Sequence, residues 1–198
     1  MSASVQANTI LILGDSISAA FGIDKTQGWV SLLDKKLSQQ CEAITVKNAS
    51  VSGETTAGGL SRLPSLLEET KPSLVVVELG GNDGLRGLSP KVMQQNLQRM
   101  IRLSKGAGAR VVVLGIHMPS NFGAAYRKLF DQAYVDATQA EEVPLLPFLL
   151  SDIYEKPNMM QEDGLHPTAN AQPLLLMNAW QVMGAEVKKI CPTLALAP

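Results

Sequence analysis

The stretch DGLHP, at residues 163–167, combines the two side-chain types that most often relay protons in hydrolytic sites. Asp163 precedes His166 by three positions, so one loop can let the carboxylate hydrogen-bond the imidazole. A serine that such a pair could activate, Ser16, lies in GDSIS shortly after the apolar run ILIL. If folding brings the three together, His166 can take the Ser16 proton while Asp163 fixes the imidazole tautomer. The residue types predict a nucleophilic serine, although each motif alone also fits a capped turn or a surface loop.

Two further turns carry groups that could stabilise negative charge. Gly53 lies in ASVSGETTAGG, and Asn82 lies in GGNDG, each directly after an apolar or β-branched segment. A glycine lets its own backbone N–H approach a ligand closely, and an asparagine amide supplies another donor. With the backbone N–H of Ser16, which we expect at the start of a helix, they predict an oxyanion hole. Read singly, Gly53 is an ordinary turn glycine and GGND a tight turn.

These residues need a fold that gathers the ends of several strands. Short β-branched runs alternate with stretches of helical period, which predicts a parallel sheet with crossover helices in a doubly wound α/β fold. Ligands in such folds bind beyond the carboxyl ends of the strands, where Ser16, Gly53 and Asn82 are expected. The strands are predicted at 9–13, 44–49, 73–79, 110–116 and 143–147.

The helices are predicted from one-face apolar spacing. Trp29 to Leu37 and Met93 to Ile101 form two such stripes, which we interpret as core. Three more segments are predicted at 54–69, where Pro64 could introduce a kink, at 123–140 and at 171–190.

Size and composition favour one domain spanning residues 1–198. Seventeen basic and eighteen acidic residues, spread singly, give a net charge of -1, which does not favour nucleic acid as a partner. The apolar runs are too short to span a bilayer. The start, MSASVQANTI, has no basic region followed by an apolar one, as in a cytosolic protein or a mature exported form.

The two cysteines and two histidines are scattered without metal-ligand spacing, so no zinc site is expected. Cys41 and Cys191 could bridge in an oxidising compartment, but two separate thiols are the preferred interpretation.

The four motifs together resemble the serine hydrolases named after their GDSL motif, also called SGNH hydrolases. The resemblance covers nearly the whole chain, and LILGDS, VELGGNDGLRG, VPLLPF and DGLHP make it similar to the bacterial thioesterase I, arylesterase and lysophospholipase branch. Carried over, it implies Ser16, Asp163 and His166 as catalytic residues, with Ser16, Gly53 and Asn82 as the oxyanion hole. It also implies a flavodoxin-like three-layer sandwich, no cofactor or metal, and export to the periplasm or outside the cell.

The chain departs from this family at two places. Ile17 replaces the leucine of the motif, a conservative change. Ser120 stands in HMPSNFG where relatives often have a second proline, which affects a loop on the substrate side.

Several side chains are candidates for contacting substrate. We expect His117, Met118 and Phe122 at the substrate site, although His117 could equally be bonded to loop backbone. Met159 and Met160 could contact an acyl chain or pack in the core. Arg86 could attract an anionic leaving group, but a solvated arginine is the preferred interpretation.

The sequence thus predicts hydrolysis of small carboxylic esters and acyl thioesters (aryl esters, acyl-CoA and lysophospholipids among them) through an acyl-serine intermediate, by a monomer that does not insert stably into membranes. Two alternatives stay open. A carbohydrate acetylesterase would use the same four motifs on an acetylated sugar. A flavodoxin-like binding module would hold a phosphate or nucleotide at the same strand ends, although no GxGxxG or GxxxxGK[ST] loop is present.

Overall fold

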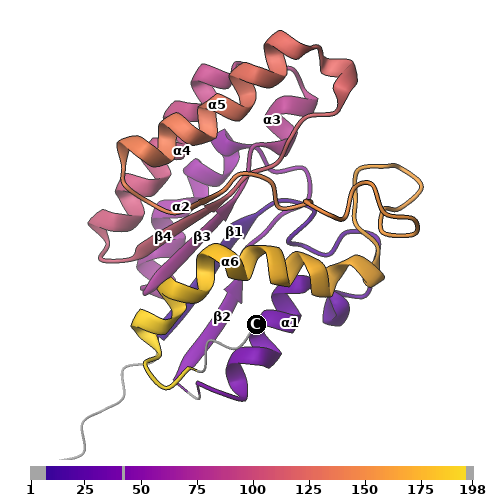
Figure 1. The fold of residues 1–198 in the computed structure, drawn as a ribbon. Helices are drawn as coiled ribbons and strands as arrows, with labels where there is room; N and C mark the ends of the chain where they lie inside the picture. The colour runs from indigo at the N-terminus through magenta and orange to yellow at the C-terminus, as the bar shows by residue number, and fades with distance from the viewer. Residues whose placement is uncertain (1–7, 42, 195–198) are drawn as a thin grey trace, which may run out of the picture.

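A computed structural model describes residues 8–41 and 43–194 of the chain (Figure 1). Five parallel strands form one sheet with the order β2-β1-β3-β4-β5. This confirms the predicted α/β class and the five parallel strands. The strands are β1 Asn8–Gly14, β2 Ile44–Asn48, β3 Leu74–Glu78, β4 Arg110–Leu114 and β5 Leu145–Leu146.

Helices cover both faces of the sheet, giving three layers (Figure 1). One face carries α1 Trp29–Ser38 and α6 Gln172–Ile190, which contact each other. The other carries α2 Thr56–Thr70, α4 Pro90–Gly106 and α5 Ala124–Ala140. Four short helices complete the described part: η1 Lys25–Gln27, α3 Gly81–Leu85, η2 Ser120–Phe122 and η3 Ala169–Ala171.

The core follows from the apolar patterns of these elements. β3 is buried along its whole length, as expected for a central parallel strand covered on both faces. Trp29, Leu33 and Leu37 of α1 are fully buried, so the stripe predicted in the sequence packs in the core. In the sheet, β2 lies on one side of β1 and β3 lies on the other side, so the direction in which strands are added reverses at β1. This reversal opens a crevice at the carboxyl ends of β1 and β3.

The elements differ from the sequence prediction mainly in the last two strands and in one short helix. β4 ends at Leu114 and β5 has only two residues, so both strands are shorter than predicted. α3 was predicted as a turn. Pro64 lies inside α2, as predicted for the helix over 54–69.

Ser16 lies in a turn after the first strand, as predicted, but the helix start expected directly after that turn is not there. Turns follow β1 instead, and η1 is the first helical element after it. Ala20 and Gly22 have φ values of 58° and 74°, a left-handed conformation that a right-handed helix cannot include. Ser16 therefore lies in a turn without a helix N-terminus behind it.

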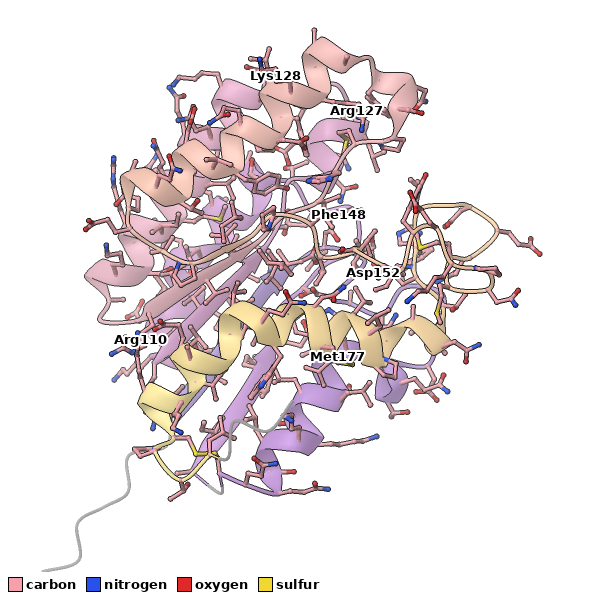
Figure 2. All side chains as sticks on the ribbon, in the orientation of Figure 1. Arg110, Arg127, Lys128, Phe148, Asp152 and Met177 are labelled. Atoms are coloured by element: carbon pink, nitrogen blue, oxygen red, sulfur yellow. A yellow bond between two sulfur atoms is a disulfide. The ribbon has the colours of Figure 1, made fainter. Side chains whose placement is uncertain are left out.

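The interpretation of Cys41 and Cys191 as separate thiols is also wrong, because they form a disulfide with a Cα–Cα distance of 6.2 Å. Figure 2 shows the sulfur–sulfur bond in yellow near the end of α6. The cysteines follow α1 and α6, and these two helices pack side by side. Tertiary packing therefore joins residues that are 150 positions apart in the sequence.

The helices and the chain start bear on the predictions about membranes and export. In the described ranges, no helix has both the length and the apolar character needed to cross a bilayer. The chain start used to judge an export signal lies largely outside the described residues, which begin at residue 8.

Candidate active site

Three of the predicted residues meet at the carboxyl end of the sheet. His166 Nε2 lies 2.8 Å from Ser16 Oγ, and His166 Nδ1 lies 2.6 Å from Asp163 Oδ2. Ser16 comes from the turn after β1, and the other two come from the segment between β5 and α6. An imidazole between a hydroxyl and a carboxylate can accept the serine proton on one nitrogen while the other is held by the acid.

The loop itself explains why Asp163 and His166 are three positions apart. Asp163 Oδ1 accepts the backbone N–H groups of Leu165 at 2.9 Å and His166 at 3.0 Å, which leaves Oδ2 for the imidazole. Burial alone would raise the pKa of Asp163, but hydrogen bonds from the His166 ring and from these two N–H groups lower it to about 2. Asp163 is therefore ionised at neutral pH and can stabilise an imidazolium.

Gly53 and Asn82, the other two predicted oxyanion residues, line the cavity that also contains Ser16. Gly53 has a φ of 79°, a conformation that favours glycine, and its carbonyl accepts a hydrogen bond from Arg86 Nη2 at 2.9 Å. Arg86 thus fixes the Gly53 turn. Asn82 lies in the first turn of α3, and its Nδ2 donates to Asp15 Oδ2 at 3.1 Å. One amide hydrogen is used in this way and the second is available for a ligand.

A second hydrogen-bonded group joins α2 to α3. Asp83 accepts the backbone N–H of Thr56 at 2.8 Å and its hydroxyl at 2.5 Å, all within the buried interior. Since Gly53 shortly precedes Thr56 and Asn82 directly precedes Asp83, this contact fixes the two predicted donors relative to each other.

Buried acids beneath Ser16 were missed in the sequence analysis. Ser18 Oγ donates to Glu78 Oε2 at 2.7 Å and accepts from Trp29 Nε1 at 3.2 Å. Burial raises the pKa of Asp15 to about 6, although the Ile17 N–H, the His166 charge and the Asn82 amide lower it. Burial and the neighbouring Asp15 charge raise the pKa of Glu78 well above its usual range. The sequence does contain a signal for these acids, because a glutamate ends the apolar run LVVVE. An ionised carboxylate is costly to bury next to such a run, so a glutamate there indicates a special environment.

The cavity above Ser16 has a volume of about 550 Å³. His117 and Met118, two of the predicted substrate contacts, line it, and His117 is stacked on Phe148 at a ring-centroid distance of 4.4 Å and an interplanar angle of 3°. Phe148 follows β5 and lies on the segment that crosses between the two helical layers (Figure 2). Other apolar lining residues are Ile17, Phe21, Leu85, Ile116, Leu150, Tyr154 and Leu165.

Three predicted substrate contacts are not among the residues that line this cavity. Phe122 lies in η2, with its ring 6.3 Å from that of Tyr126. Met159 and Met160 are half-buried against the core, and Met160 pairs with Pro167 in an isolated antiparallel bridge. Whether these side chains contact substrate stays a prediction.

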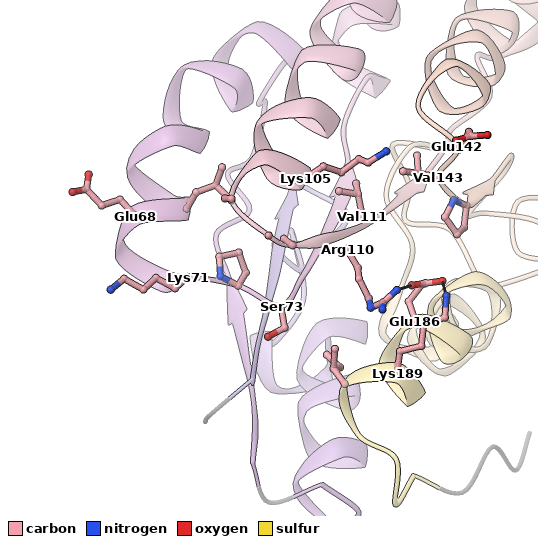
Figure 3. Close-up of a pocket in the computed structure, with 17 residues that line it drawn as sticks. Glu68, Lys71, Ser73, Lys105, Arg110, Val111, Glu142, Val143, Glu186 and Lys189 are labelled. Carbon is pink, nitrogen blue, oxygen red and sulfur yellow. Dashed lines mark hydrogen bonds and ion pairs between the residues drawn. The ribbon is translucent and has the colours of Figure 1, made fainter. Parts of the chain in front are cut away.

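A second, open pocket of about 1020 Å³ lies at the opposite end of the sheet (Figure 3). Arg110 and Lys189 both contact Glu186 there, at 3.1 Å and 2.6 Å, and Lys105 donates to the Glu141 carbonyl. These charges are used within the protein, so we assign no chemistry to this pocket. Within the described residues, no group of three or more His, Cys, Asp or Glu side chains could hold a metal ion.

A Ser–His–Asp arrangement is typical of serine hydrolases, and here it lies at the carboxyl edge of a doubly wound α/β sheet. The sequence matches the GDSL-like Lipase/Acylhydrolase family over residues 12–172, and the chain belongs to this family.

Relatives with known names share most of the chain. It is 50% identical to "Esterase TesA" of Pseudomonas aeruginosa, covering 89% of this chain and 88% of that protein. It is 42% identical to "Thioesterase 1/protease 1/lysophospholipase L1" of Escherichia coli strain K12, covering 85% and 80%. Among solved structures, esterase EstA from Pseudoalteromonas sp., inhibited by monoethylphosphonate, matches with a TM-score of 0.86 and 41% identity, covering 91% and 99%.

Proposed function

We propose that this protein hydrolyses carboxylic esters and acyl thioesters, including aryl esters, acyl-CoA and lysophospholipids, through an acyl-serine intermediate. The observation that carries the proposal is the hydrogen-bonded line from Ser16 through His166 to Asp163. The names of the relatives, esterase, arylesterase and thioesterase, support the same chemistry and do not favour a sugar acetylesterase or a binding module.

In the first half of the reaction, Ser16 Oγ attacks the acyl carbon and His166 accepts its proton. The carbonyl oxygen becomes an oxyanion, which the N–H groups of Ser16 and Gly53 and the amide of Asn82 stabilise. The bond to the leaving group then breaks, and the alcohol or thiol departs with the proton from His166.

In the second half, His166 removes a proton from water as the water oxygen attacks the acyl carbon. When the bond from the acyl carbon to Ser16 Oγ breaks, His166 returns that proton to Oγ and the carboxylic acid departs. Asp163 stabilises the imidazolium in both halves. The apolar cavity around Ile116, Met118 and Phe148 suits the hydrocarbon part of the substrate.

The test is hydrolysis of p-nitrophenyl esters from acetyl to long acyl chains, and of acyl-CoA, by the protein and by Ser16→Ala and His166→Ala variants. Both variants should lose several orders of magnitude in kcat while keeping the wild-type circular dichroism spectrum. Turnover that survives in Ser16→Ala would refute the acyl-serine mechanism. Absence of turnover in folded wild-type protein would refute the activity itself.

The proposal extends to location and assembly. The Cys41–Cys191 disulfide supports export to the periplasm or beyond, because disulfides persist in oxidising compartments. A monomer stays a prediction that light scattering of the purified protein can test.

A further inference from the structure

The nucleophile and its base lie on separate segments that must be held in register. Ser16 and His166 are 150 positions apart, and their hydrogen bond spans only 2.8 Å. A displacement of about 1 Å at such a contact can cost about a hundredfold in rate. The segment carrying His166 therefore needs a fixed position relative to the turn carrying Ser16.

The His166 segment is internally ordered as a small hairpin over residues 158–168. Met160 pairs with Pro167 in an antiparallel bridge, and Thr168 N–H donates to the Met159 carbonyl at 2.8 Å. At the turn, Gly164 has a φ of 66°. These contacts give the hairpin its shape but do not place it against Ser16.

Gln161 makes the contact between hairpin and turn. Its Nε2 donates to the Phe21 carbonyl at 2.8 Å and to the Pro167 carbonyl at 3.0 Å. Its backbone N–H donates to the His166 carbonyl at 2.7 Å. Gln161 thus binds the carbonyls of His166 and the next residue, and reaches across to the Ser16 side of the site.

In the turn that carries Ser16, Phe21 is hydrogen-bonded directly to the nucleophilic residue. Its N–H donates to the Ser16 carbonyl at 3.0 Å, and its ring lies 4.5 Å from the His166 ring between centroids. The turn also packs closely against Gln161, because a Cβ on Gly22 would overlap the Gln161 side-chain oxygen.

We propose that Gln161 is a positioning residue that sets the distance between His166 and Ser16 by joining the base hairpin to the nucleophile turn. This inference rests on the proposed function. It also explains the residue type: one side-chain nitrogen with two hydrogens can serve two carbonyl acceptors, which an ionised glutamate cannot do.

The test compares Gln161→Ala and Gln161→Glu with a matched control, Gln132→Ala, on the exposed surface of α5, where the side chain bonds only Asp136 among its contacts in the described residues. Both Gln161 variants should lower kcat on a p-nitrophenyl ester about 10- to 100-fold. KM should stay within about threefold, because the Gln161 side chain is not among the residues that line the cavity. Gln132→Ala should match the wild type.

A double variant tests whether Gln161 affects the rate through His166. In a His166→Ala background, Gln161→Ala should cause no further loss of the residual rate. Gly22→Ala provides an independent route, since it displaces the amide without removing it, and should lower kcat in the same way.

The inference is overturned if folded Gln161→Ala keeps the wild-type kcat, if KM alone changes, or if the loss persists fully without His166. If Gln161→Ala does not fold, Gln161→Glu and Gly22→Ala decide by the same kcat criterion. A failure of the proposed function is distinct, because wild-type protein would then show neither ester turnover nor labelling of Ser16 by a phosphonate ester.

Discussion

At the scale of single residues, the site depends on how a few polar groups share their hydrogen bonds. Asn82 gives one amide hydrogen to Asp15 and keeps the other for a ligand. Asp163 divides its two oxygens between backbone N–H groups and the imidazole. In both cases the local bond orients the side chain before substrate arrives, which is the condition for electrostatic stabilisation of a transition state.

Replacement of Asn82 by alanine should remove one of the three proposed oxyanion donors. We expect kcat to fall about 10²- to 10³-fold, with a smaller change in KM, because the donor acts mainly on the charge that develops in the transition state. Steady-state kinetics on p-nitrophenyl esters measure this. A folded Asn82→Ala protein with full turnover would show that the oxyanion assignment is wrong.

Glu78 should make stability depend on pH in a direction opposite to that of most carboxyl groups. Its pKa is raised in the folded protein, so the folded state binds a proton that the unfolded state has released. Stability from this group is therefore lost as pH rises above the unfolded pKa, with a slope of up to about 1.4 kcal/mol per pH unit.

A Glu78→Gln variant should lack this loss, so its stability relative to wild type should increase between pH 5 and pH 8. Urea unfolding at several pH values measures the difference. Glu68→Gln, on the exposed surface of α2, is the control and should keep the wild-type dependence. An equal pH dependence in Glu78→Gln and wild type would contradict the assignment.

At the scale of elements, the site is positioned by close packing of helices on the sheet. α2 approaches β1 and the end of β3 where Gly59 faces Leu79 and Leu13, and a Cβ on Gly59 would overlap the Leu79 side chain. This close approach places the start of α2, and with it the Gly53 turn, beside α3.

Gly59→Ala should therefore destabilise the fold by about 1–3 kcal/mol, as other overpacking substitutions do. Gly106→Ala is the matched control, since a Cβ there meets no atom within 4 Å and alanine favours a helix by up to about 1 kcal/mol. Urea denaturation compares the two variants. A neutral Gly59→Ala would show that α2 can shift outward without cost.

At the scale of the whole molecule, the disulfide closes a loop of 150 residues far from the cavity. Figure 2 places it near the end of α6. Its main effect should be on the unfolded chain, whose conformational entropy it restricts.

Reduction, or replacement of Cys41 and Cys191 by alanine, should lower the free energy of unfolding by about 2–5 kcal/mol. The kcat of the folded protein at 25 °C should not change. Urea unfolding with and without dithiothreitol measures the effect, and the double alanine variant should be insensitive to the reductant. A stability unaffected by reduction would contradict this account.

Local sequence patterns were enough to predict the class of fold and the polar residues at the strand ends. β-branched runs separated by helical stripes require a parallel sheet covered on both faces, and the carboxyl ends of parallel strands lie at one edge. Ser16, Gly53 and Asn82 follow three such strands, so their meeting is a consequence of local patterns. Asp163 and His166 are only three positions apart on one loop, which is also local information.

Contacts between segments that are distant in sequence became visible only in the folded molecule. The Cys41–Cys191 bond, the Glu78 carboxyl beneath Ser18 and the contact of Gln161 with Phe21 each join residues at least 60 positions apart. No periodicity specifies such pairs, because they depend on which helices pack together and how loops fold over the sheet. The helix expected after the Ser16 turn is likewise absent, since residues 20 and 22 are left-handed there and a Cβ on Gly22 would overlap the Gln161 side chain.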